Sequence, residues 1–123
     1  MVQCRQIDEI RITVTTMNER LYHDRLDELM IAIEDAIEDS ELDIDYETSA
    51  GILTLRCPDN SQVILSRQTA LLQLWVAAKS GGFHFNYDES EQAWILEGSD
   101  DVLSVVLNRC LSEQCGCEVS LAI

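Results

Sequence analysis

Apolar residues between positions 19 and 40 recur at the spacing of an α-helix. Tyr22, Leu26, Leu29, Ile33 and Ile37 share one helical face, and the stretch contains no proline or glycine. Acidic residues hold the opposite face, namely Asp24, Asp27, Glu28, Glu34, Asp35, Glu38 and Asp39. The pattern predicts an amphipathic helix, with Asn18 as its N-cap.

The spacing then changes to a period of two, which is typical of β-strands. Over residues 42–48, apolar positions (Leu42, Ile44 and Tyr46) alternate with acidic ones (Asp43, Asp45 and Glu47), which predicts a half-buried strand with an acidic outer face. Turn-forming residues separate the later apolar runs. We therefore predict further strands at residues 52–57, 62–67, 72–78, 83–87 and 92–97.

A second helix is predicted from Ser99 as N-cap, because Asp100 and Asp101 suit the first turn and an apolar stripe follows them. Residues 118–122 are predicted to form a short last strand or an extended tail. We expect an α+β fold: a two-layer sandwich whose mainly antiparallel sheet of five to six strands carries both helices on one face. This domain spans residues 17–123, after an N-terminal extension, residues 1–16, expected to be a disordered tail.

The charge of the chain is strongly negative, with 23 acids, 8 bases and a formal net charge of −15. Phosphates would be repelled, so nucleic acid is excluded as an expected partner, whereas metal ions and basic protein surfaces are favoured. No apolar run approaches the roughly 18 residues of a membrane span. Residues 1–16 lack the features of an export signal, so we expect a cytoplasmic protein without a membrane partner.

Eight carboxylates and no base lie within residues 34–47: Glu34, Asp35, Glu38, Asp39, Glu41, Asp43, Asp45 and Glu47. Negative charge at the end of a helix opposes the helix dipole, and a bound cation would relieve the repulsion. Carboxylates suit hard cations, including iron ions. An EF-hand is excluded because Thr48 and Thr54 stand where that loop needs glycine and glutamate. The alternative is a solvated charged face.

Trp75 is the second unusual feature. The aliphatic residues of the strand at 72–78 have the better claim on the core, which predicts that Trp75 lies with Gln73 on the open face of the sheet. Arg67 and Gln68 are expected to line the same patch, and His84 to be a polar surface residue. The alternative is a different register, with Trp75 in the core.

The cysteines and histidines form no recognisable catalytic motif, so we expect a protein that is not an enzyme. Cys110, Cys115 and Cys117 are close enough in sequence for a thiolate metal site. Their spacing matches no common zinc pattern, however, and Cys110 falls on the apolar face of the second predicted helix. A small buried thiol is the alternative interpretation of Cys110.

Three stretches resemble the frataxin family, and specifically its bacterial branch. They are Leu-Asp-Ile-Asp-Tyr-Glu at residues 42–47, Ser-Arg-Gln-Thr-Ala-Leu-Leu-Gln-Leu-Trp at 66–75, and Ala-Ala-Lys-Ser-Gly-Gly-Phe-His-Phe at 77–85. The likeness runs from about Met17 to the C-terminus. Two positions depart from the family pattern, since Ser66 replaces an asparagine and Ala70 a proline.

The resemblance implies an iron chaperone that regulates iron–sulfur cluster assembly and holds ferrous or ferric iron weakly at its surface, with other divalent cations able to compete. The implied iron ligands are Glu34, Asp35, Glu38, Asp39, Asp43, Asp45 and Glu47. The implied partners are the cysteine desulfurase and the iron–sulfur scaffold protein, contacted through Glu34, Asp35, Glu38, Arg67, Gln68, Gln73 and Trp75. We expect a monomer, with an iron-dependent oligomer as the alternative.

Two other functions compete with this hypothesis. One is an acidic protein-interaction module whose metal binding is incidental; it predicts partner binding that persists without iron and weakens with salt. The other is a ferroxidase, which would need a defined site with two closely held metal ions.

Overall fold

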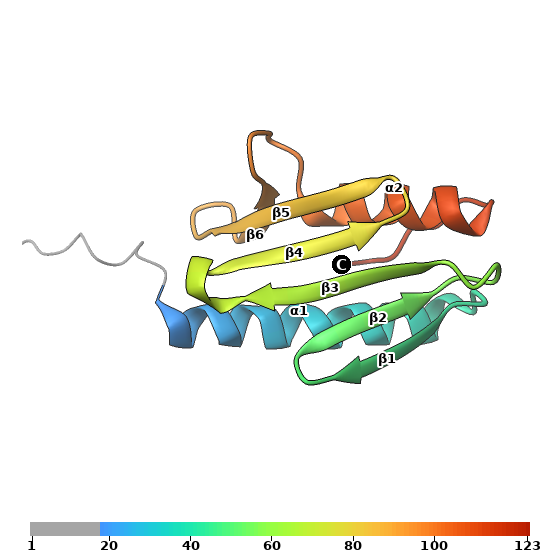
Figure 1. Ribbon diagram of the computed structural model, residues 1–123, viewed down its shortest axis with the longest axis horizontal. Coiled ribbons are helices and arrows are strands. Elements are labelled where there is room, and N and C mark those ends of the chain that lie inside the picture. The colour runs from blue at the N-terminus through green and yellow to red at the C-terminus, as the bar shows by residue number, and fades with distance from the viewer. Residues whose placement is uncertain (1–17) are drawn as a thin grey trace, which may run out of the picture.

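The computed structural model describes residues 18–123 and confirms the two-layer α+β sandwich. Six strands form one antiparallel sheet in chain order, and both helices cover the same face of it (Figure 1). The elements are α1 (Glu19–Ser40), β1 (Asp45–Ser49), β2 (Ile52–Arg56), β3 (Gln62–Gln68), the 3-10 turn η2 (Thr69–Leu71), β4 (Gln73–Ala78), β5 (Gly81–Asp88), β6 (Ala93–Leu96) and α2 (Leu103–Cys115). The predicted extension, residues 1–16, lies outside the described residues.

Helix α1 begins as predicted, because the Asn18 side chain accepts a hydrogen bond from the backbone N–H of Leu21 at 2.8 Å. Its buried stripe differs at one position from the prediction. Met30 rather than Leu29 is buried, and Leu29 is half-buried at the edge of the core. The helix ends at Glu41, whose left-handed backbone turns the chain toward β1.

Alternation along the strands separates a buried face from an open one. The buried face packs against the helices through Leu53, Leu55, Val63, Leu65, Leu74, Val76, Phe85 and Trp94. Trp94 makes edge contacts with Tyr22 and Tyr87, with ring centroids 6.0 and 5.2 Å apart. The Tyr22 hydroxyl donates to the Gln73 carbonyl at 2.6 Å, which fastens α1 to β4. The core therefore lies between the sheet and its two helices.

Helix α2 starts later than predicted, because the turn before it uses Ser99 differently. The Ser99 hydroxyl accepts from the backbone N–H of Asp101, while the carbonyl of Asp101 accepts from Leu96. Val102 bridges to Ile95 of β6 and becomes the N-cap of α2. The prediction of Ser99 as N-cap was wrong, since local hydrogen bonding by serine competes with helix formation.

Residues 118–122 form an extended tail and no strand. Val119 and Leu121 are buried, and the tail runs behind the sheet between the two helices (Figure 1). Asn108 exchanges hydrogen bonds with the backbone of Leu121, at 2.9 and 3.3 Å, and Ser112 does the same for Val119, at 2.8 and 3.2 Å. Polar groups of α2 thus take the place of a neighbouring strand. Neither α1 nor α2 has the length and apolar character needed to cross a membrane.

Candidate functional site: an acidic ridge and an open sheet face

The acidic ridge is the set of seven carboxylates proposed above as iron ligands. Four come from the last turns of α1, one from the loop after it and two from β1: Glu34, Asp35, Glu38, Asp39, Asp43, Asp45 and Glu47. All are exposed except Glu34, which is half-buried. Within residues 18–123, none of the seven takes part in an ion pair, although a base, Arg56, lies opposite Asp45 in the β1–β2 register.

Two hydroxyl groups of β1 donate hydrogen bonds to carboxylates of the ridge. Thr48 donates a hydrogen bond to Glu34 at 2.5 Å, and Tyr46 donates one to Glu38. The hydrogen bond to Glu38 is the largest cause that raises the pKa of Tyr46 to about 12, with smaller contributions from burial and from the charges of Glu38, Glu34 and Asp35. These two bonds tie the edge strand to α1. These two hydrogen bonds were not predicted from the sequence, although the period-two pattern places both hydroxyls on the helix side of β1.

The ridge is divided between the two layers. Tyr46 and Thr48 point toward α1, so Asp45 and Glu47, which alternate with them, point to the open side of β1. A hollow of about 610 Å³ separates the end of α1 from β1, lined by Ile37, Glu38, Glu41, Leu42, Ile44, Asp45, Tyr46, Glu47 and Arg56. In the described part of the chain, no three histidine, cysteine or acidic side chains converge to hold a metal ion. The ridge can therefore offer one or two carboxylates to each of several cations, rather than a closed cage.

The open face of the sheet presents the Trp75 patch, formed by Trp75, Gln73, Gln68, His84, Asn86 and Glu97. The structure confirms the predicted side for Trp75. Its indole N–H donates to the Gln73 side chain at 2.9 Å, and its ring stacks on His84 with centroids 4.2 Å apart and planes 8° from parallel. Gln73 in turn donates to Glu97 at 2.7 Å and to Asn86 at 3.3 Å. The half-buried indole is held in one orientation by its neighbours.

Gln68 and His84 join this patch for the same geometric reason. Gln68 lies opposite Gln73 in the β3–β4 register, and His84 lies opposite Trp75 in the β4–β5 register, so each shares the face of its partner. His84 is exposed, as predicted, but its stacking on Trp75 was not foreseen. Predicting this stacking would have required the register of β4 against β5, which the sequence alone did not supply.

Arg67 corrects the sequence prediction, because it does not line the Trp75 patch. It lies opposite Leu74 on the helix side of the sheet. Its guanidinium donates to Asp27 of α1 at 2.5 Å and lies 2.7 Å from Nδ1 of His23. Neighbouring residues of a strand point to opposite faces, so Arg67 and Gln68 could not both share the face of Trp75. The structure gives Arg67 a role in joining α1 to β3.

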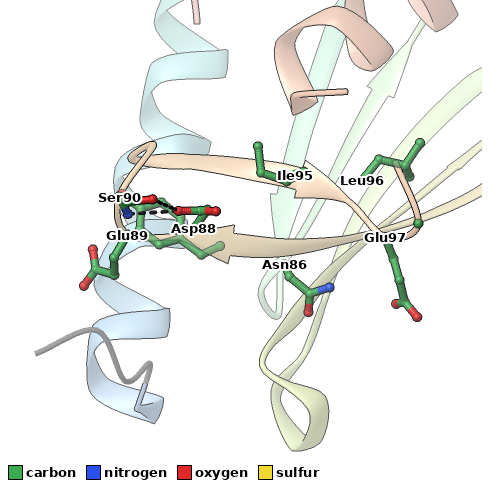
Figure 2. A pocket seen from close by; sticks show the side chains of 9 residues that line it. Asn86, Asp88, Glu89, Ser90, Ile95, Leu96 and Glu97 are labelled. Carbon is green, nitrogen blue, oxygen red and sulfur yellow. Dashed lines mark hydrogen bonds between the residues drawn. The ribbon is translucent and has the colours of Figure 1, made fainter. Parts of the chain in front are cut away.

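A second hollow, of about 410 Å³, adjoins the patch at the β5–β6 hairpin. Figure 2 shows Asn86 and Glu97 pointing the same way beside it, with Asp88, Glu89 and Ser90 at the hairpin tip. Asp88 accepts hydrogen bonds from Ser90 and from the backbone of Glu91, and these bonds lower the pKa of its carboxyl group. Asp88 therefore stabilises the turn, and one of its oxygens, Oδ1, accepts all of these bonds.

The thiolate interpretation of Cys110, Cys115 and Cys117 does not survive in the structure. Cys110 is fully buried, and its sulfur lies 3.8 Å from the Ser80 hydroxyl. Burial raises the pKa of its thiol. Cys117, in contrast, is exposed beyond the end of α2. The three do not form a group that could hold a metal ion.

Comparison with known proteins identifies the same family throughout. The family model of the frataxin-like domain matches residues 15–117. The iron-sulfur cluster assembly protein CyaY of Pseudomonas aeruginosa is 53% identical over 103 residues, which cover 84% of this chain and 95% of that protein. CyaY of Azotobacter vinelandii is 49% identical over 104 residues, covering 85% and 94%.

Two solved structures share the architecture. The frataxin of Psychromonas ingrahamii superposes with a TM-score of 0.77 at 31% identity, covering 85% of this chain and 97% of that one. Yeast frataxin superposes with a TM-score of 0.59 at 20% identity, covering 89% and 97%. The likeness to the yeast protein concerns the fold alone.

Proposed function

Because the chain belongs to the frataxin family, we propose that it is a non-catalytic accessory protein of iron–sulfur cluster assembly. Its relatives in Pseudomonas and Azotobacter carry that role in their names. The acidic ridge would hold ferrous or ferric iron loosely, and the ridge and the Trp75 patch together would dock on a cysteine desulfurase and its scaffold protein. The observation that carries the proposal is the ridge itself, seven carboxylates without a neutralising ion pair among the described residues.

Iron delivery calls for binding that is reversible. Hard Fe³⁺ favours oxygen ligands and borderline Fe²⁺ accepts them, and carboxylates on an open surface exchange their ions readily. Glu34 and Glu38 already accept hydrogen bonds from β1, whereas no side chain of the described residues donates a hydrogen bond to Asp35, Asp39 or Asp43. Asp45 and Glu47 accept none either, but they project from the open side of β1, where Arg56 lies opposite Asp45. We therefore assign the first contact with iron to the three aspartates of α1 and the loop after it.

Docking would use the same negative charge over a longer range. A net charge of −15 steers the protein toward a basic surface, and the ridge concentrates that charge on one edge of the molecule. The Trp75 patch would then add a contact of another kind, because a fixed, half-buried tryptophan beside polar groups is a common binding anchor. Since ridge carboxylates serve both tasks, iron and partner would compete for them.

A second function, an acidic interaction module with incidental metal binding, is favoured by one observation. The described residues contain no convergent group of three metal-ligating side chains. In that case the ridge would act only through its charge. The two functions differ in whether iron alters the effect of the protein on its partners.

The test is cluster assembly on a purified scaffold protein with its cysteine desulfurase, followed by absorbance with Fe²⁺ as the iron source. The native chain should change the rate, and Asp35→Lys/Asp39→Lys/Asp43→Lys should have lost that effect. The charge-matched control is Glu91→Lys/Glu113→Lys/Glu118→Lys, which reverses three exposed acids away from the ridge. An effect of the native chain that is equal at every iron concentration would favour the interaction module. No effect of the native chain at all would contradict the accessory role.

A further inference from the structure

Three cysteines belong to the two segments that meet where the end of α2 contacts the turn between β2 and β3. Cys57 follows β2 and is buried, Cys115 is the last residue of α2 and is half-buried, and Cys117 is exposed two residues later. Neither the acidic ridge nor the Trp75 patch uses any of them. The positions of Cys115 and Cys117 depend on how the last turn of α2 packs against the β2–β3 turn.

Gln114 holds the two elements together at this point. Its side-chain amide donates to the Ser61 hydroxyl at 3.0 Å and the Gln62 carbonyl at 3.3 Å, and it lies 3.9 Å from the Cys57 sulfur. Its carbonyl oxygen accepts from the backbone of Lys79 at 2.9 Å. A nearly buried glutamine with this many partners fixes the last turn of α2 against the β2–β3 turn. The neighbouring Cys115 is thereby held against Cys57.

Cys57 belongs to the buried core and Cys115 packs against that core, next to Gln114, whose side-chain amide lies 3.9 Å from the Cys57 sulfur. Burial is the main cause that raises the pKa of Cys115 to about 12, and the neighbouring Cys57 thiol contributes to the rise. Cys115 is therefore a protonated thiol at neutral pH and a slow nucleophile on its own. The exposed Cys117 is the thiol that a soluble reagent meets first.

We propose that Cys57 and Cys115 are a redox-responsive dithiol, which a low-molecular-weight disulfide oxidises through Cys117. The product is a disulfide that joins the end of α2 to the β2–β3 turn. This inference concerns a modification site and is independent of the proposed role in cluster assembly.

The reaction is a sequence of thiol–disulfide exchanges. Cys117 attacks the soluble disulfide and forms a mixed disulfide, releasing one soluble thiol. Cys115 attacks the Cys117 sulfur and releases the second soluble thiol. Cys57 then attacks the Cys115 sulfur, which forms the Cys57–Cys115 disulfide and returns Cys117 to its thiol form. Two electrons and two protons pass from Cys57 and Cys115 to the soluble disulfide, and excess soluble thiol reverses the sequence.

The experiment equilibrates the full chain in buffers of reduced and oxidised glutathione, then blocks free thiols by alkylation. Digestion after arginine and glutamate separates residues 57–67 from residues 114–118, and mass spectrometry reads the cross-link between them. The native chain should show this link in oxidising buffer and lose it on reduction. Its melting temperature should rise by several degrees, since the link closes a long loop.

Single variants assign the sulfur atoms. Cys117→Ser should still form the link, but its rate should fall by a factor of about ten or more. The direct reaction depends on the scarce thiolate of Cys115. Cys115→Ser should form no link, although residues 114–118 still contain Cys117. A native chain whose Cys57 stays alkylated at every glutathione ratio would overturn the proposal. An unchanged rate in Cys117→Ser would overturn the entry role of Cys117.

Discussion

The contacts that a side chain makes in this protein depend on the face of the sheet from which it projects. Trp75 and Trp94 lie on neighbouring parts of the sheet, yet Trp75 stacks on His84 on the open face and Trp94 packs between Tyr22 and Tyr87 in the core. We therefore expect the same residue type to serve recognition in one place and stability in the other.

Replacing each tryptophan by alanine should separate these two roles. Trp94→Ala removes a buried ring and should lower the free energy of unfolding by about 3–5 kcal/mol. Trp75→Ala loses mainly a stacking contact and should lower it by about 1 kcal/mol. Urea denaturation of both variants measures the difference. Equal destabilisation by the two changes would mean that Trp75 belongs to the core.

Tyr46 reports the negative potential of the acidic ridge. In Glu38→Gln the pKa of Tyr46 should fall from about 12 toward the ordinary value near 10, because the charged acceptor has been removed. Titration of the ¹³C-labelled tyrosine ring by NMR follows this group separately from Tyr22 and Tyr87. A pKa that stays at about 12 in the variant would show that Glu38 is not the cause.

The raised pKa of Tyr46 also makes stability depend on pH. The folded chain keeps the Tyr46 proton more tightly than the unfolded chain, so the group stabilises the fold below pH 10. That contribution is lost as the pH rises from about 10 to about 12. The free energy of unfolding should therefore fall more steeply over this range in the native chain than in Tyr46→Phe. Parallel curves for the two proteins would contradict the assignment.

At the scale of whole elements, the extended tail, one of the two forms predicted for residues 118–122, packs into the core. Leu121 is buried and its backbone is fastened to Asn108 of α2. Leu121→Ala should lower the free energy of unfolding by about 2–4 kcal/mol, as for other buried leucines. The exposed neighbour Ala122 offers the control, since Ala122→Ser should change stability by less than about 0.5 kcal/mol. Thermal denaturation of the two variants checks both values.

Elements with strong local signals could be predicted from the sequence. Features that depend on hydrogen-bond partners elsewhere in the chain could not. Asn18 caps α1 as predicted, and each of the six predicted strands has a counterpart in the sheet, although β1 begins at Asp45 and not at residue 42. The predicted start of α2 was wrong because Ser99 belongs to a turn, in which its backbone N–H donates to the carbonyl of Leu96 in β6. Local periodicity carries no information on such contacts.

The same reason explains which parts of the candidate site were predicted. The carboxylates of the ridge are close in sequence, and the side of Trp75 follows from alternation within one strand. The prediction that Arg67 lines the Trp75 patch was wrong, because residues that are close in sequence need not share a face of the sheet. The hydrogen bond from Thr48 to Glu34 joins α1 to an edge strand, and only the packed structure shows it.

Across the whole molecule, negative charge and a fixed aromatic patch form the surface through which we expect it to act. The ridge occupies the β1 edge, and the Trp75 patch lies in the middle of the open face, so one partner could touch both. Long-range attraction from the ridge would set the rate of encounter, and the patch would set the lifetime of the complex.

Docking of the ridge on a cysteine desulfurase, which we propose, is tested by measuring the affinity of the native chain for a purified bacterial desulfurase at low and high salt. Asp35→Lys/Asp39→Lys/Asp43→Lys should bind about tenfold more weakly or worse at low salt, and high salt should weaken the native chain toward the same affinity. Glu91→Lys/Glu113→Lys/Glu118→Lys should bind nearly as the native chain does. Equal weakening by both triple variants, or native binding that does not respond to salt, would contradict docking through the ridge.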